Sequence, residues 1–122
     1  MSKIYSPLKN ILALPTSKGV EFIDTNRIIR IEAKSNYSKL YFDNGKSLLV
    51  AKVLSWFEGK LSADQFVRTH RTHFINKSFI SFFKISTSKI ELVTGEWIDV
   101  SRRKKHFFST MMLNCTGRVE TL

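Results

Sequence analysis

The chain of 122 residues lacks several features that mark common protein classes. Its one cysteine, Cys115, has no second cysteine with which to form a disulfide. No apolar run approaches the ~18 to 20 residues that cross a bilayer, and residues 1–10 lack the apolar stretch of a signal peptide. We therefore expect a cytoplasmic protein without a membrane span.

Signs of catalysis are also missing. Cys115 lies in a polar tail, no glycine-rich phosphate loop occurs, and the acidic residues are scattered without a carboxylate pair. Glu32 and Asp43 each stand near lysines at the end of an expected strand, where a surface counter-charge is the simpler interpretation. The sequence therefore predicts neither an enzyme nor a bound cofactor.

Acidic residues are few compared with basic ones. The chain has 20 Lys and Arg against 10 Asp and Glu, a formal net charge of +10 at pH 7. The excess grows along the chain, because residues 1–64 hold 10 cations and 6 acids, whereas residues 66–122 hold 10 cations and 4 acids. Such a balance attracts polyanions, and nucleic acid is the first candidate.

The apolar content is sufficient for one folded domain. Hydrophobic residues make up 43% of the chain, with ten Phe, three Tyr and two Trp. This is too much apolar surface for a disordered basic tail, and the length matches the commonest domain size of ~100 to 150 residues. We expect a single domain.

Two basic runs are the most informative features. Residues 66–77, FVRTHRTHFINK, place three cations and two imidazoles among large apolar residues without an acid. Residues 101–106, SRRKKH, form the second run. Both adjoin expected strands or the start of a helix, so a folded scaffold can hold their donors toward an anionic partner.

Most of the chain follows the pattern of short antiparallel strands, which predicts a mainly β fold. Ile29 and Ile31 are expected on one face of a strand over residues 27–33, with Ile28, Arg30 and Glu32 on the other. The other expected strands cover residues 11–14 and 19–23 around a turn at 15–18, then 37–42, 47–50, 79–85, 89–93 and 97–100.

Two turns are marked by glycine. Asp43-Asn44-Gly45-Lys46 predicts a hairpin with a two-residue turn, because Asn-Gly tolerates positive φ angles. Thr94-Gly95-Glu96 predicts a second hairpin between the strands over residues 89–93 and 97–100.

One short amphipathic helix is expected over residues 51–61. Val53, Leu54, Phe57 and Leu61 recur at helical spacing and should face the core. Phe57 is the central residue of this predicted face.

A C-terminal helix is expected over residues 101–113, with the side chain of Ser101 as its N-cap. Arg102, Arg103, Lys104 and Lys105 stand in its first turn, where cations oppose the helix dipole. This unfavourable placement favours a functional role, the binding of an anion at the start of the helix.

Five pieces in this order resemble the LytTR DNA-binding domain of bacterial response regulators. The resemblance covers about residues 9–113. The pieces are Ile31-Glu32-Ala33 with Asn36-Tyr37, Asp43-Asn44-Gly45 with its return strand, the helix over residues 54–61, FVRTHRT with Ile75-Asn76, and the Gly95 turn leading to Val100-Ser101-Arg102-Arg103.

The resemblance implies about ten short antiparallel strands in small packed sheets, which place loops in successive major grooves of DNA. It also implies a transcription regulator, either stand-alone or the effector domain of a two-component response regulator. Residues 1–8 would be a tail or the end of a linker, and residues 114–122 a C-terminal tail.

The resemblance further implies which residues contact DNA. Arginine can donate two hydrogen bonds to guanine, and asparagine can bind an adenine edge, so the expected base-reading residues are Asn36, Arg71 and Arg103. The expected phosphate contacts, which would set the register, are Lys34, Arg68, Ser101, Arg102 and Lys104. Tyr37, His70 and Thr72 could contact DNA or serve the structure.

Partners other than one DNA site follow from the same resemblance. LytTR domains usually follow a receiver domain, for which this chain has no room, so a receiver in cis or a sensor-kinase pathway is possible. Two copies are expected on tandem direct-repeat sites about one helical turn apart.

Other interpretations of the basic runs stay open. Tyr37, Tyr41 and Phe74 lie among cations and could stack on unpaired bases of RNA, and residues 102–105 could bind an acidic protein or a membrane surface. His70 and His73 do not predict a metal site, because residues 66–77 hold no Cys, Asp or Glu. His70 and Asn76 are more simply interpreted as structural hydrogen-bonding residues.

Overall fold

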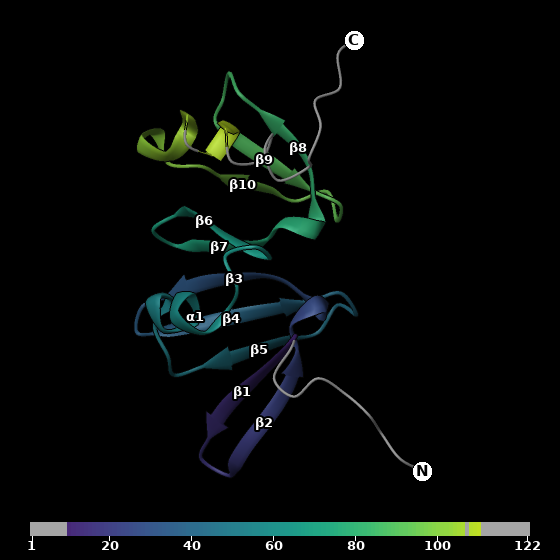
Figure 1. Ribbon diagram of the computed structural model, residues 1–122, viewed down its shortest axis with the longest axis vertical. Coiled ribbons are helices and arrows are strands. Elements are labelled where there is room, and N and C mark those ends of the chain that lie inside the picture. The colour runs from purple at the N-terminus through teal and green to yellow at the C-terminus, as the bar shows by residue number, and fades with distance from the viewer. Residues whose placement is uncertain (1–9, 107, 111–122) are drawn as a thin grey trace.

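The computed structural model describes residues 10–106 and 108–110 (Figure 1). The described residues form ten strands, a short α-helix, three 3-10 turns and a further helical stretch at residues 105–106 and 108–110, so the predicted mainly β fold is confirmed. The strands are β1 (Ile11–Thr16), β2 (Gly19–Asp24), β3 (Ile28–Lys34), β4 (Tyr37–Phe42), β5 (Ser47–Val50), β6 (Phe66–His70), β7 (His73–Asn76), β8 (Ile80–Lys84), β9 (Lys89–Leu92) and β10 (Trp97–Asp99). The helical elements are α1 (Leu54–Lys60) and the 3-10 turns η1 (Thr25–Arg27), η2 (Lys77–Phe79) and η3 (Arg102–Lys104).

The strands build three small antiparallel sheets. A five-stranded sheet in the order β5-β4-β3-β7-β6 occupies the middle of the molecule in Figure 1. The hairpin β1-β2 lies below it in this view, and the three-stranded sheet β10-β9-β8 lies above it. The five-stranded sheet is therefore the element that joins the two ends of the molecule.

Two hydrophobic clusters form the core, and strand β3 contributes to both. Ile28 and Ile31 pack in the first cluster, whereas Ile29 packs in the second. The first cluster also holds Leu12, Leu14, Ile23, Leu40, Val50, Leu54, Phe57, Leu61, Phe66 and Phe74. The second also holds Val67, Ile75, Ile90, Leu92, Ile98, Val100 and Phe108.

The prediction that Ile29 and Ile31 share a face is wrong. The pairing of β3 with β4 shifts its register between Ile28 and Arg30. Such an irregularity adds a residue to one strand and reverses the alternation of its side chains beyond that point. Ile28 and Ile31, although three residues apart, therefore pack on the same side of the sheet, and Ile29 packs on the other.

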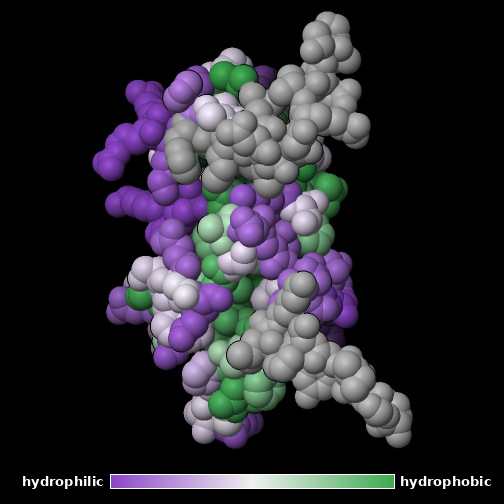
Figure 2. Space-filling model, viewed as in Figure 1, coloured by the Kyte–Doolittle hydropathy of each residue, from purple (hydrophilic) through white to green (hydrophobic). Residues whose placement is uncertain are grey.

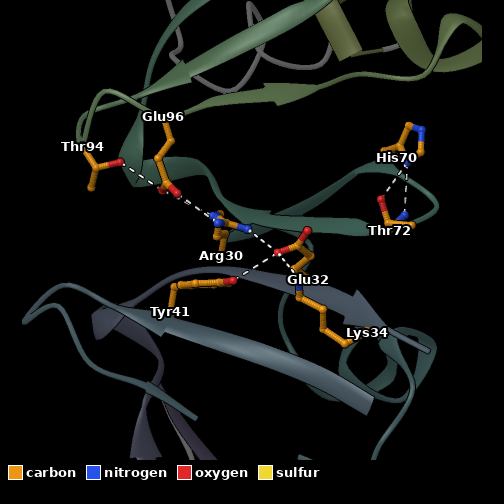
Figure 3. Close-up of polar contacts among 8 residues, drawn as sticks. All are labelled: Arg30, Glu32, Lys34, Tyr41, His70, Thr72, Thr94 and Glu96. Atoms are coloured by element: carbon orange, nitrogen blue, oxygen red, sulfur yellow. Dashed lines mark hydrogen bonds and ion pairs between the residues drawn. The ribbon is translucent and has the colours of Figure 1, made fainter. Parts of the chain in front are cut away.

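Arg30 is a buried cation between the middle sheet and the three-stranded sheet (Figure 3). Its Nη2 bonds Glu96 Oε2 at 3.0 Å, and its Nη1 bonds Glu32 Oε1 at 3.2 Å. Its guanidinium carbon lies 3.8 Å from the centroid of the Tyr41 ring. Glu96 lies in the turn between β9 and β10, so this ion pair connects the two sheets.

The charges of this network stabilise one another. Burial opposes the charge of Arg30, but its bonds with Glu96 and Glu32 outweigh that effect and raise its pKa. Burial likewise opposes the charge of Glu32, but the Arg30 interactions prevail and lower the pKa of that carboxyl. The hydrogen bond from Arg30 lowers the pKa of Glu96. All three groups are therefore held in their charged forms.

Both glycine-marked hairpins are present, with a loop one residue longer than predicted for the first. Gly45 N donates to Phe42 O at 3.1 Å, and Phe42 N donates to Lys46 O at 2.9 Å. Among residues 43–45 only Gly45 has a positive φ, of 85°. The connection is therefore a three-residue loop that ends on glycine, not a two-residue turn with two positive φ angles.

The β1–β2 hairpin has a shorter turn than predicted. The turn expected over residues 15–18 is confined to Ser17 and Lys18, because Pro15 pairs with Val20 and Thr16 pairs with Gly19. Proline is accepted there since β1 has only one neighbouring strand.

Helix α1 buries the predicted residues except one. Leu54, Phe57 and Leu61 are buried, but Val53 is 48% exposed. Val53 has an extended backbone at the N-cap, so its side chain stands before the helix and not on its core face.

The C-terminal helix begins as expected but is not capped by a side chain. Ser101 is the N-cap of η3, yet its hydroxyl makes no capping hydrogen bond. Lys104 N, the donor that such a cap would bind, already donates to Ser101 O at 3.0 Å. Helical conformation continues at residues 105–106 and 108–110, and residues 111–113 lie outside the described part.

Candidate nucleic-acid interface

A cleft lies where helix α1, the β6–β7 loop and the start of η3 meet. Its volume is about 510 Å³. Among the described residues that line it, five were predicted to contact DNA, namely Arg68, Arg71, Ser101, Arg103 and Lys104; the others are His70, for which a structural role was also expected, and Glu58 of α1. The fold thus brings the two basic runs, which begin 35 residues apart in the sequence at residues 66 and 101, to one site.

Strand β6 holds the second basic run in place through its backbone. Ser101 N donates to Thr69 O at 2.8 Å. Lys104 Nζ donates to Arg68 O at 3.3 Å. Both bonds use carbonyl oxygens of consecutive β6 residues, so the segment that carries Arg103 is attached to the strand that leads to Arg71.

The side chain of Arg68 is bonded within the protein. Its Nε donates to His70 O at 2.9 Å, and its Nη2 donates to Arg71 O at 2.6 Å. Its Nη1 bonds Glu58 Oε1 in an ion pair. The side chain is only 19% exposed. Three of its five N–H donors are therefore already bonded, its charge is paired with Glu58, and its low exposure makes it a poor phosphate contact.

Arg71 and Arg103 differ from Arg68 in this respect. Both are exposed, and within the described residues neither side chain has an intramolecular hydrogen bond, ion pair or ring contact. Arg102 is exposed in the same way. Figure 2 shows hydrophilic side chains projecting from the left of the molecule at the level of the β6–β7 loop and η3 of Figure 1. These guanidinium groups are free to bind an external anion or acceptor.

His70 has a structural hydrogen bond at the tip of the loop (Figure 3). Its Nδ1 lies 3.0 Å from Thr72 Oγ1, and Thr72 N donates to the same Nδ1 at 3.3 Å. Because a backbone N–H can only donate, Nδ1 is an acceptor, and a neutral ring carries its proton on Nε2. His70 and Thr72 thus fix the loop that presents Arg71.

His73, the cross-strand partner of His70, is half-buried. Its ring centroid lies 5.7 Å from that of His70, and its buried Nδ1 has no hydrogen-bond partner among residues 10–106 and 108–110. Burial lowers the pKa of His73. The ring is therefore held in its neutral form.

The β3–β4 hairpin lies beside this loop but outside the cleft lining. Ala33 N donates to Thr72 O at 2.9 Å, which joins the two loops. Lys34 pairs with Tyr37, so Asn36 stands at the exposed tip of a two-residue connection whose other residue, Ser35, has a φ of 60°. Lys34 Nζ lies 3.5 Å from Glu32 Oε1. The hairpin therefore presents an exposed amide and one cation that is shared with a carboxylate.

Asn76 has the structural role expected for it. It is buried, donates from Nδ2 to Ile28 O at 2.9 Å and accepts from Ser78 N at 3.0 Å as the N-cap of η2. This asparagine therefore connects strand β7 to strand β3.

The roles of two residues, Glu58 and Arg30, were not predicted from the sequence. Glu58 stands on the polar face of α1, and nothing in its spacing indicates a partner ten residues later. Arg30 was placed on a strand face as an ordinary charge, because its partner Glu96 is 66 residues away. Only the tertiary structure brings these opposite charges together.

The arrangement suits an extended polyanion better than a small ligand. The cleft is open, its free donors are guanidinium groups, and its acid is already paired with Arg68. The described residues contain no group of three His, Cys, Asp or Glu side chains that could hold a metal ion. No described helix has the length and apolar character needed to cross a membrane.

Comparisons with known proteins give a consistent result. A family model described as the LytTr DNA-binding domain matches residues 18–112. The CO-responsive transcriptional regulator RcoM of Rhodospirillum rubrum is 33% identical over 71 residues, which are 58% of this chain and 30% of that regulator. The LytTr DNA-binding domain of a protein described as a methyl-accepting/DNA response regulator from Bacillus cereus matches with a TM-score of 0.66. That structural match has 23% identity and covers 89% of this chain and 98% of the other, so the fold is the same.

Proposed function

Since the chain belongs to the LytTR family of DNA-binding domains, we propose that it reads a specific sequence of double-stranded DNA and thereby regulates transcription. Two regions would contact the major groove. One is the β6–β7 loop together with η3, which form the cleft, and the other is the tip of the β3–β4 hairpin. The proposal commits the chain to reading with loops instead of a recognition helix.

The contrast between free and bonded arginines carries the proposal. Arg71 and Arg103 line one cleft and are exposed, whereas Arg68, which lines the same cleft, is bonded internally. Arginine recognises guanine through two hydrogen bonds to O6 and N7, which requires a side chain free of other acceptors. We therefore assign base reading to Arg71 and Arg103.

Phosphate contacts would come from residues at and beside the cleft, of which Arg102 is exposed. Arg102 is also free of partners in the described structure, and Ser101 and Lys104 line the cleft. These residues would set the register of the protein on the duplex without reading sequence. Arg68 is better suited to positioning than to the phosphate contact first assigned to it.

The β3–β4 hairpin would supply the second reading element. Asn36 is exposed at its tip and could bind an adenine edge, with Lys34 and Tyr37 against the sugar-phosphate backbone. The hydrogen bond from Ala33 N to Thr72 O fixes this hairpin beside the first loop. The two elements would read neighbouring base pairs as one unit.

The regulatory setting is also part of the proposal. Residues 9–113 would be the DNA-binding domain of a response regulator or of a stand-alone regulator. Two copies would bind tandem direct repeats, where a receiver domain or another signal raises the effective concentration of the second copy. The chain spans only 30% of the length of RcoM, so the CO response of that regulator is not part of the function proposed for this chain.

The test is a selection followed by a titration. The protein is used to select duplexes from a randomised pool, and fluorescence anisotropy then measures its Kd for the selected duplex, a scrambled duplex and the corresponding single strands at two salt concentrations. We expect the selected duplex to bind at least ~100-fold more tightly than the scrambled one, with the difference surviving raised salt.

Two other outcomes would refute the proposal. Equal binding to all duplexes that disappears with salt would leave only nonspecific charge attraction. Preference for single-stranded RNA would move the function to an RNA-binding module that stacks bases on exposed aromatic rings.

A further inference from the structure

Among the residues that the structure describes, Glu58 is the one acid that lines the basic cleft. It projects from α1, and its Oε1 bonds Arg68 Nη1. An acid in this position has an electrostatic cost, because it lies among the cations proposed to meet phosphates and should repel them. Its presence therefore needs a compensating role.

We propose that Glu58 and Arg68 are positioning residues that hold the β6–β7 loop in the conformation in which Arg71 meets a base edge. The inference rests on the proposed function, because it assigns the source of sequence discrimination at the same cleft. Helix α1 is not itself assigned a contact with a base. Through Glu58 it would nevertheless determine how accurately Arg71 reads one.

The hydrogen bonds of Arg68 define how the pair acts. Its Nε and Nη2 donate to the carbonyl oxygens of His70 and Arg71, the residues at the bend between β6 and β7. Its third nitrogen, Nη1, bonds Glu58. With one nitrogen fixed to the helix, the planar guanidinium presents the other two to the loop in a single orientation.

Glu58 also prevents a competing use of Arg68. A guanidinium without a carboxylate partner would bind a DNA phosphate, which is a strong acceptor for arginine. Arg68 would then leave the carbonyl oxygens of His70 and Arg71. The carboxylate thus keeps Arg68 on the loop when DNA approaches.

The same strand connects the pair to the second base reader. Lys104 Nζ donates to Arg68 O, and Ser101 N donates to Thr69 O. A shift of β6 at Arg68 would therefore also move the segment that carries Arg103. Loss of the Glu58 bond is expected to affect discrimination at both bases, and most strongly at the base read by Arg71.

The experiment compares two variants with a charge-matched control. Glu58→Gln removes the acid, and Arg68→Lys keeps the charge but removes the planar fork. Asp43→Asn removes another acid, one that pairs with Arg27 at 3.1 Å in the β4–β5 turn and does not line the cleft. For each protein, anisotropy gives the Kd for the selected and the scrambled duplex, and thermal unfolding gives Tm.

The two roles of Glu58 predict opposite signs. A positioning role predicts that Glu58→Gln binds scrambled DNA as tightly as the parent or more tightly, but weakens binding to the selected duplex. The discrimination ratio, which is the Kd for the scrambled duplex divided by the Kd for the selected duplex, should fall ~5- to 100-fold. This is the discrimination provided by one bidentate arginine contact. Arg68→Lys should lower the ratio similarly, while Asp43→Asn leaves it unchanged.

A double-mutant cycle locates the effect at Arg71. If Glu58 acts mainly through that residue, Glu58→Gln should lower the ratio much less in the Arg71→Ala background than in the parent, and the small remaining fall should come from the base read by Arg103. Independent, additive losses would show that Glu58 does not act through Arg71 and would overturn the assignment.

The remaining outcomes also decide the question. Equal tightening on both duplexes in Glu58→Gln would make Glu58 a repulsive surface acid only. Equal weakening on both with a lower Tm, together with an unchanged ratio in Arg68→Lys, would make the pair a stabilising contact only. A parent protein that does not discriminate at all refutes the proposed function instead, whereas a discriminating parent with unchanged variants refutes this inference alone.

Discussion

The guanidinium of Arg30 stacks on the ring of Tyr41, with its central carbon 3.8 Å from the ring centroid. The Tyr41 hydroxyl donates to Glu32 Oε1 at 3.2 Å, the same oxygen that Arg30 Nη1 approaches. A buried cation is thus enclosed by an aromatic face and two carboxylates. This arrangement ties the sheet that carries the β3–β4 hairpin to the sheet that precedes η3.

Replacing Arg30 should therefore weaken the whole fold. Arg30→Met keeps much of the volume but leaves Glu32 and Glu96 without their partner, and we expect a loss of about 2 to 3 kcal/mol in the free energy of unfolding. This is less than the ~3 to 5 kcal/mol of a fully buried pair, because Glu96 is 44% exposed and can be hydrated. Urea unfolding measures the change.

The control for Arg30 is Arg27→Met. Arg27 pairs with Asp43 at 3.1 Å, but both side chains are exposed, so its loss should cost below about 1 kcal/mol. Similar costs for the two variants would contradict the view that burial makes the Arg30 network important.

Acid should destabilise the protein in two steps. Burial lowers the pKa of His73 from 6.5, so the unfolded chain takes up the proton first and stability falls as the pH drops below about 6.5 through the folded-state pKa. The carboxyl pKa values of Glu96 and Glu32 are lowered from 4.5, so a second loss begins as the pH drops below about 4.5.

Variants assign the first acid step. His73→Gln should abolish the loss between about pH 6.5 and 5 and leave the later one, while His106→Gln, which changes an exposed ring, should leave both. The check is the urea midpoint from pH 7.5 to 3.5. A midpoint in the parent protein that stays constant down to pH 5 would disprove the role of His73.

The two kinds of DNA contact can be separated at the cleft. Arg71→Ala should relax preference at one base pair by ~1 to 3 kcal/mol, and Arg103→Ala at another. Arg102→Ala should weaken all duplexes alike and reduce the slope of log K against log salt by about 0.9, the value for one phosphate contact. Anisotropy on single-substituted duplexes measures both quantities. The assignment fails if all three variants lose affinity uniformly.

The helix face is tested by Phe57→Ala. Phe57 is fully buried in the first cluster, so removal of its ring should cost ~3 to 5 kcal/mol. Phe22→Ala is the control, because the side chain of Phe22 is 67% exposed and its loss should cost little. A cost below about 1 kcal/mol for Phe57→Ala would contradict the packing of α1.

The features that local sequence determines were predictable. Gly45 and Gly95 marked hairpins because positive φ angles favour glycine there, and the spacing of Leu54, Phe57 and Leu61 identified the buried face of α1. Two basic runs identified most of the cleft. The resemblance to a known family ordered these pieces into a fold.

The features that depend on distant partners were not predictable. The irregularity beside Ile29 arises from the pairing of β3 with β4, so strict alternation gave the wrong face. Arg68 was predicted to contact phosphate. Its bonds to Glu58 and to loop carbonyl oxygens, which form only in the folded chain, could not be predicted from the sequence. Charge alone indicated which residues could bind DNA, but not which were already in use.

Strand β3 sends Ile28 and Ile31 into one cluster and Ile29 into the other. Because both clusters include side chains of this one strand, a movement of one cluster relative to the other would disrupt the packing of β3. The hairpin tip with Asn36 and the loop with Arg71 project from the one sheet that contains β3, and the bond from Ala33 N to Thr72 O joins them, so their spacing is fixed. If both loops read one target, DNA whose sequence does not match that spacing would have to bend or twist to fit, so targets rich in easily deformed pyrimidine–purine steps should be favoured.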